Sequence, residues 1–268
     1  MLKTLSIALV AVMFCGLALS APQAKTPQAK TKEEYKAYND ANAVTGGAAM
    51  EKAARHFAGK FPASELTVYL YSRALHEYQN ENNPARILEM GRIVLALDPA
   101  NVNALVLTAT VLSDSLSAED ADRAKKVDEI REDCERAEKS ISAGAAPAGA
   151  TPEQVAAYNG TLQAMIHSAL GIMELKLGND AAAEKQLKAA TLVENVQPDA
   201  FVWYHLALAM DHQKEYPEAL AAVNQALRFV KSNPELQKLA TGERDRLAKL
   251  SSAAPAQAPQ PETGKAPR

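Results

Sequence analysis

The sequence predicts an all-α protein, built as a solenoid of helix-turn-helix repeats with an extended helical hairpin in its middle. Three observations support this fold class. A pattern recurs after 36 residues, apolar side chains within each copy recur at three- and four-residue steps, and 47% of the residues are apolar with few aromatic rings among them. Self-similarity at such a period is typical of arrays whose units bury their apolar faces on their neighbours.

The repeat is clearest between residues 164–198 and 200–234. The paired positions are Leu170 and Leu206, Gly171 and Ala207, Ala183 and Ala219, Leu187 and Val223, Ala190 and Ala226, and Pro198 and Pro234. Within the second copy, a polar turn at residues 213–216 separates two apolar stripes of helical period. Pro217 suits the start of the second helix, because the first helical amide has no intrahelical partner. The copy therefore predicts an αα-hairpin.

These helix pairs resemble the tetratricopeptide repeat (TPR), whose pattern runs Trp, Leu-Gly, Tyr, Ala, Phe, Ala, Pro. Two positions depart from it: His167 stands at the place of the Trp and Glu174 at the place of the Tyr. Both prolines come one turn late, so each second helix is expected to be one turn longer than usual. The matching residues are Trp203, Leu206, Ala207, Ala219 and Ala226 in the last copy, and Leu170, Gly171, Ala183 and Ala190 in the copy before it.

The resemblance covers most of residues 34–234 and implies a TPR-like solenoid of an exported bacterial protein. Its expected units are 34–64, 65–99, 100–143, 151–198 and 199–234, with a terminal capping helix at 235–251.

The N-terminus has the features of an export signal over residues 1–20. Lys3 precedes the apolar run Leu5–Leu19, and Ala18 and Ser20 are small residues at the positions that a signal peptidase reads. We expect cleavage after Ser20 and a periplasmic or cell-envelope location. The alternative is an uncleaved membrane anchor, because the apolar stretch approaches the roughly 18 residues of a membrane span.

Two segments outside the expected solenoid have compositions without helical period. Residues 21–33 are predicted to form a flexible tether, and the Ala/Pro-rich residues 252–268 a disordered tail.

The central part of the chain departs from the repeat. One helix is expected from about Ala118 to Ile141, and a second is expected to follow the capping box formed by Thr151 and Gln154 and to end near Leu177. The resulting hairpin either projects as a docking arm or dimer contact, or packs back along the solenoid. The apolar stripe of its first helix comprises Ala121, Ala124, Val127, Ile130, Cys134, Ala137 and Ile141.

The sequence offers little catalytic chemistry. Cys134 lies on an apolar stripe, where a free cysteine acts as a small hydrophobe. No phosphate loop, nucleophile motif or haem motif occurs, so no enzyme activity and no cofactor are predicted. His205 and His212 share a helix face and, with Asp211, offer an alternative reading as a metal or small-ligand site. Zinc sites usually have more ligands in closer groups, so we expect no metal.

The expected function is a non-enzymatic protein–protein interaction or assembly module. A formal net charge of −3 argues against nucleic acid as a partner. Membrane contact is expected only if the N-terminal segment is retained, which would make the protein a tethered assembly factor, and a homo-oligomer is left open.

The resemblance implies a concave groove lined by the first helix of each pair, where a protein or peptide partner would bind. The carboxylate clamp of some family members is absent, since Ser72, His76, Leu107, Met165 and Ala169 stand at its places. Trp203 is expected in the core. The candidate partner-binding residues are Arg73, His76, Gln79, Asn80, Phe201, Tyr204, His205, Asp211 and His212.

Overall fold

The computed structural model describes residues 28–146, 149–194, 196–197, 199–230 and 233–253, and every regular element within these ranges is an α-helix. The all-α class is thus confirmed. The expected signal at 1–20 and nearly all of the expected tail at 252–268 lie outside the described residues, as does most of the tether at 21–33. The helices are α1 (Lys32–Asn42), α2 (Gly47–Lys60), α3 (Thr67–Asn80), α4 (Pro84–Leu97), α5 (Val102–Ser115), α6 (Arg123–Ser142), α7 (Pro152–Lys176), α8 (Asp180–Thr191), α9 (Ala200–His212), α10 (Tyr216–Phe229) and α11 (Pro234–Ala253).

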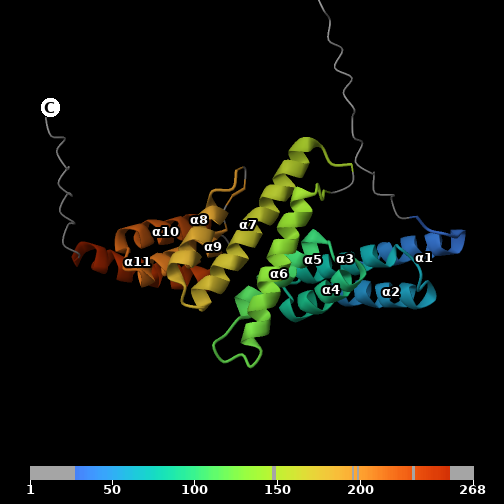
Figure 1. Ribbon diagram of the computed structural model, residues 1–268, viewed down its shortest axis with the longest axis horizontal. Helices are drawn as coiled ribbons and strands as arrows, with labels where there is room; N and C mark the ends of the chain where they lie inside the picture. The colour runs from blue at the N-terminus through green and yellow to red at the C-terminus, as the bar shows by residue number, and fades with distance from the viewer. Residues whose placement is uncertain (1–27, 147–148, 195, 198, 231–232, 254–268) are drawn as a thin grey trace, which may run out of the picture.

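Successive helices pack against one another in chain order, which is the arrangement that a solenoid of helical hairpins requires. In addition, α1 contacts α3, α5 contacts α7, α7 contacts α9, and α9 contacts α11, so first helices of neighbouring pairs lie side by side. Figure 1 shows the pairs following one another from α1 at one end to α11 at the other. The structure therefore has the stacked helix pairs that the TPR resemblance implies.

Polar side chains fix several helix starts. Asn83 accepts a hydrogen bond from the amide of Arg86 at the start of α4, and Asn101 accepts one from Ala104 at the start of α5. The capping box predicted at Thr151 and Gln154 is present, with both reciprocal hydrogen bonds formed. These side chains satisfy amides that have no partner within the helix.

Within the described residues, the core is a series of three apolar clusters along the solenoid. Met50, Leu70 and Met90 are fully buried among α1–α4. Further along, α7 contributes Ile166 to the middle cluster and Ile172 to the C-terminal one. Burying one such side chain contributes about 1.5–3 kcal/mol to folding. Because α7 serves two clusters, it connects the two halves of the protein.

The first helix of the central hairpin begins later than predicted. Residues 116–122 form a loop, in which the Asp120 carboxylate accepts a hydrogen bond from the amide of Ser117 at 2.9 Å, and α6 starts only at Arg123. Ala121 lies in this loop and Ala124 in the first turn of α6, and both are exposed and do not belong to the buried stripe. The remaining predicted stripe residues, Val127, Ile130, Cys134, Ala137 and Ile141, are buried.

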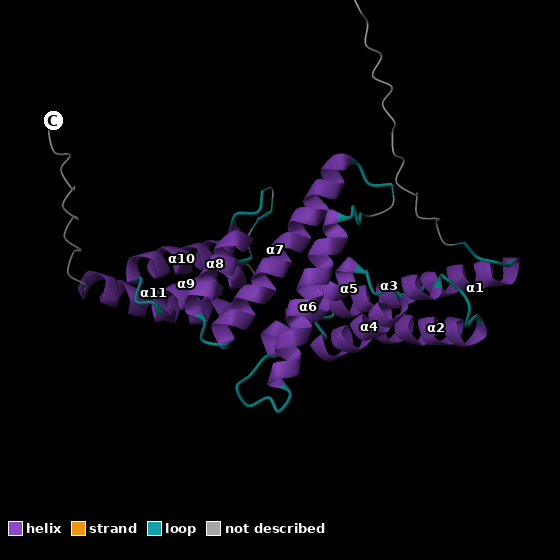
Figure 2. Cartoon of the chain, in the orientation of Figure 1, coloured by secondary structure: helices purple, strands orange, loops and turns teal. Residues whose placement is uncertain are grey.

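The hairpin of α6 and α7 is built into the solenoid along most of its length, since both helices pack against α5. Only the first two turns of α7 are largely exposed, and Figure 2 shows this end extending past the neighbouring helices. The structure thus favours the packing alternative for most of the hairpin.

The expected extra turn of the second helices is not found in either copy of the repeat: α10 has 14 residues, the same number as α4, and α8 has 12. α8 ends at Thr191, and the residues after it, as far as they are described, are not helical. Val193 and Val196 instead lie over Gly160, where a Cβ would meet them at 3.4 and 3.1 Å. The long α7 leaves an uncovered surface beyond the end of α8, and these valines cover it.

No helix among the described residues is long and apolar enough to cross a lipid bilayer.

Candidate functional site

A hollow of about 360 Å³ lies where α3, α5 and α7 face one another, on the side formed by the first helices of three successive pairs. We call it the inner groove. It is lined by Ser72, Leu75, His76, Gln79, Asn101, Asn103, Val106, Leu107, Tyr158, Thr161, Leu162 and Met165.

Helical spacing explains why these side chains meet. Ser72, His76 and Gln79 follow one another at four- and three-residue steps on α3, and Tyr158, Thr161 and Met165 do so on α7. Residues at these spacings share one face of a helix. Each helix therefore presents a single stripe to the groove.

The groove has an apolar floor and a polar rim. Leu75, Leu107 and Leu162 at its base are buried, whereas His76 and Gln79 at its edge are exposed. Such a combination, an apolar surface with a few placed polar groups, is typical of binding sites.

The groove carries no Asp, Glu, Lys or Arg among the described residues that line it. The Tyr158 hydroxyl donates a hydrogen bond to Asn103 Oδ1 at 3.1 Å, which joins α7 to α5 across the rim. Burial raises the pKa of Tyr158, so the phenol stays neutral and remains a donor. The chemistry offered to a ligand is that of neutral amides, hydroxyls and an imidazole.

The N-terminal group of predicted binding residues is divided by the structure. His76 and Gln79 line the inner groove, but Arg73 and Asn80 do not. Arg73 donates to the carbonyl oxygen of Asn42 at 2.8 Å and forms an ion pair with Glu77, so it ties α3 to the end of α1. Asn80 is the exposed last residue of α3.

The C-terminal group lies on α9, away from this groove. Phe201 is 44% exposed, while Tyr204 and His205 are half-buried. The His205 Nδ1 atom lies 2.8 Å from the carbonyl oxygen of Phe201, and burial lowers the pKa of His205. Trp203 packs against the C-terminal core cluster, as expected. None of these residues lines the inner groove, so they form a separate surface.

Asp211 and His212 point to different helices and do not converge with His205. Asp211 forms an ion pair with Arg246 of α11 at 2.5 Å, and His212 Nδ1 lies 2.9 Å from a carboxylate oxygen of Asp180 in α8. Within the described ranges, no three His, Cys, Asp or Glu side chains are placed to hold a metal ion. The arrangement gives the metal alternative no support.

Cys134 behaves as a core residue. It is 1% exposed, and burial raises the pKa of its thiol to about 12. A thiol with such a pKa is not an effective nucleophile near neutral pH.

The sequence reasoning missed the contribution of α7 to the groove, above all Tyr158 and Thr161. The N-terminal half of this helix was expected in a hairpin that either projects or packs back along the solenoid, and no groove residue was named on it. The available signal was Met165, one of the positions at which the TPR resemblance implies a groove, since Tyr158 and Thr161 lie on the same helical stripe.

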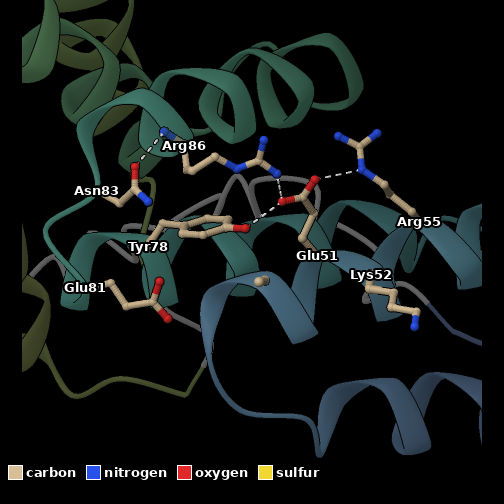
Figure 3. Close-up of a pocket in the computed structure, with 8 residues that line it drawn as sticks. Glu51, Lys52, Arg55, Tyr78, Glu81, Asn83 and Arg86 are labelled. Carbon is tan, nitrogen blue, oxygen red and sulfur yellow. Dashed lines mark hydrogen bonds and ion pairs between the residues drawn. The ribbon is translucent and has the colours of Figure 1, made fainter.

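A second hollow, of about 540 Å³, lies between α2, α3 and α4 and surrounds the buried carboxylate of Glu51 (Figure 3). The Tyr78 hydroxyl donates to Glu51 at 2.6 Å, the Arg55 Nε donates at 2.8 Å, and the Arg86 guanidinium also contacts it. Glu89 pairs with both arginines, at 2.8 Å from Arg55 and 2.5 Å from Arg86. The charges neutralise one another, so this cluster serves as a brace between the first two helix pairs.

No family model and no curated protein sequence matches the chain. Among solved structures, the chain is similar to TTC0263, a thermophilic TPR protein of Thermus thermophilus, with 18% identity, 79% of this chain and 94% of that chain covered, and a TM-score of 0.47. It is also similar to the MamA protein, with 18% identity, 69% of this chain and 88% of that chain covered, and a TM-score of 0.40. At these identities the likeness concerns the fold alone.

Proposed function

We propose that this protein is a non-enzymatic interaction module that binds a protein or peptide partner in the inner groove. The observation that carries the proposal is the groove itself, in which three successive first helices place polar side chains around an apolar floor. Gln79 and Asn103 at its rim each offer an amide group that both donates and accepts hydrogen bonds, as a peptide main chain requires.

Export to the periplasm or cell envelope is also part of the proposal, and it is supported by the sequence of residues 1–20. N-terminal sequencing of the protein isolated from its cells tests it. A mature chain that begins at Ala21 is expected, whereas a chain that still contains Leu5–Leu19 would favour the membrane-tethered alternative.

A matched pair of arginine variants tests the groove as the binding site. Thr161 is exposed at the groove, and Gln237 is exposed on α11, which packs against α9 and α10. T161R places a long charged side chain into the groove, while Q237R adds the same charge elsewhere. In crosslinking pull-downs from native cells, partners should be lost with T161R and retained with Q237R. Equal recovery with both variants would contradict the groove as the binding site.

A further inference from the structure

The absence of Asp, Glu, Lys and Arg among the described residues that line the inner groove restricts what it can bind. The twelve lining residues include seven polar side chains, Ser72, His76, Gln79, Asn101, Asn103, Tyr158 and Thr161, and none of them is Asp, Glu, Lys or Arg. By contrast, charged side chains dominate the hollow around Glu51. A ligand charge placed over Leu75, Leu107 and Leu162 would lose hydration without gaining an opposite charge, which is unfavourable.

The floor of the groove provides a place for one apolar side chain. Leu107 and Leu162 are buried beneath it, and Met165 beside them is half-buried, so its flexible thioether can adapt to an apolar group. A volume of about 360 Å³ lies at the lower end of the range for ligand sites. The groove therefore has room for one apolar side chain of a peptide and the main chain next to it. It is too small to admit the surface of a folded protein.

Polar groups that can bond a peptide main chain lie at the rim of the groove, around the apolar floor. Gln79 on α3 and Asn103 on α5 are both exposed, so two of the helices that line the groove carry an accessible amide group. In the part of the chain that the structure describes, no Lys or Arg lines the groove to pair with a terminal carboxylate, so an internal segment of a chain fits better than a chain end.

We propose that the inner groove recognises an uncharged, internal peptide segment through one apolar anchor side chain, a specificity that rests on the proposed function and refines it. The ligand class is thus a neutral peptide with a residue such as leucine at its centre. Charged segments and free carboxyl termini are excluded.

Blocked amino acids test this specificity, because they carry peptide groups on both sides of one side chain. The isotope-labelled protein, residues 21–268, is titrated with N-acetyl-leucinamide, N-acetyl-lysinamide and N-acetyl-aspartic acid α-amide, and the shifts of its amide and methyl resonances are recorded by NMR. The leucine probe should shift resonances of Leu107, Leu162 and Met165 and should bind at least about tenfold more tightly than either charged probe, a difference of about 1.4 kcal/mol. Equal affinities, or no shift at these residues, would overturn the proposal.

Two groove variants and one control keep the test interpretable. T161R and Q79R alter exposed residues on different helices, so the loss of fold in one leaves the other available, and Q237R is the control. Leucine binding should be lost with T161R and with Q79R and retained with Q237R. If T161R abolishes partner recovery but the segment bound by the wild type is charged, the proposed function stands and this inference falls.

Discussion

Gly171 on α7 and Leu187 on α8 are in such close contact that a Cβ on Gly171 would lie 2.6 Å from the Cγ atom of Leu187. At the equivalent positions 36 residues later stand Ala207 and Val223, a larger residue opposite a smaller one. Both of these residues are also fully buried. The two copies of the repeat thus distribute similar volume differently across the same helix–helix contact.

This relationship predicts that G171A destabilises the protein and that a second change rescues it. Overpacking should lower the free energy of unfolding by about 1–2 kcal/mol, although alanine is the better helix former. G171A/L187V, which restores the combination of Ala207 and Val223, should recover most of this loss in urea unfolding.

The control for this prediction is G242A, because a Cβ on Gly242 of α11 would meet no atom of the described residues within 4 Å. It should raise stability by up to about 1 kcal/mol. If G171A were as stabilising as G242A, the close contact between α7 and α8 would be contradicted.

Lys214 ends its helix in a left-handed conformation and gives a second prediction. Its φ is 65°, and the residue 36 positions earlier is Gly178, with φ 79°. Left-handed φ is unfavourable for a lysine but not for glycine. K214G should therefore raise the free energy of unfolding by about 0.5–1 kcal/mol, as measured by urea titration.

The matched control is K185G, within the exposed face of α8, where glycine should cost about 1 kcal/mol. Destabilisation by both variants would show that the turn at Lys214 does not have this geometry.

Asp133 predicts a pH dependence of stability. Its side chain is buried, its Oδ2 atom has no hydrogen-bond partner among the described residues, and burial raises its pKa to about 7 from an ordinary value of 3.8. The other charges around it are Arg136, Glu129, Glu132 and Arg92. Between about pH 4 and pH 7 the folded state retains a proton on Asp133 that the unfolded chain releases. The contribution of Asp133 to the free energy of unfolding therefore falls as the pH rises through this range, and it is constant above about pH 7.

The variant D133N removes this titration. The free energy of unfolding of D133N minus that of wild type should be about 2–3 kcal/mol larger at about pH 8 than at about pH 5. D128N, which removes an exposed carboxylate from the same helix, is the control. A difference between D133N and wild type that does not change with pH would contradict the buried, protonated carboxyl.

The sequence predicted the local features of the fold well, because they depend on short-range chemistry. The capping box at Thr151 and the burial of Cys134 follow from residue type and helical period alone. The start of α6 was misplaced because the alanines at 121 and 124 continue the helical period, although residues 116–122 form a loop. Periodicity cannot reveal such a loop.

The candidate site was only half predictable, because it depends on which helices meet. His76 and Gln79 were found from their place on a first helix, but Tyr158 joins them only through the packing of α7 on α5. Asp211 and His212 are neighbours in sequence, yet successive helical residues point about 100° apart, and they contact different helices.

Site-specific photocrosslinking tests the central claim, binding in the inner groove, most directly. A photoreactive phenylalanine derivative is placed in turn at Thr161 in the groove and at Lys185, which is exposed on α8. In native cells, the derivative at position 161 should crosslink a partner, unmodified wild-type protein should compete for that partner, and the T161R protein should not compete. The derivative at position 185 should give no such product. Crosslinking from position 185 alone would place the binding surface outside the groove and contradict the account.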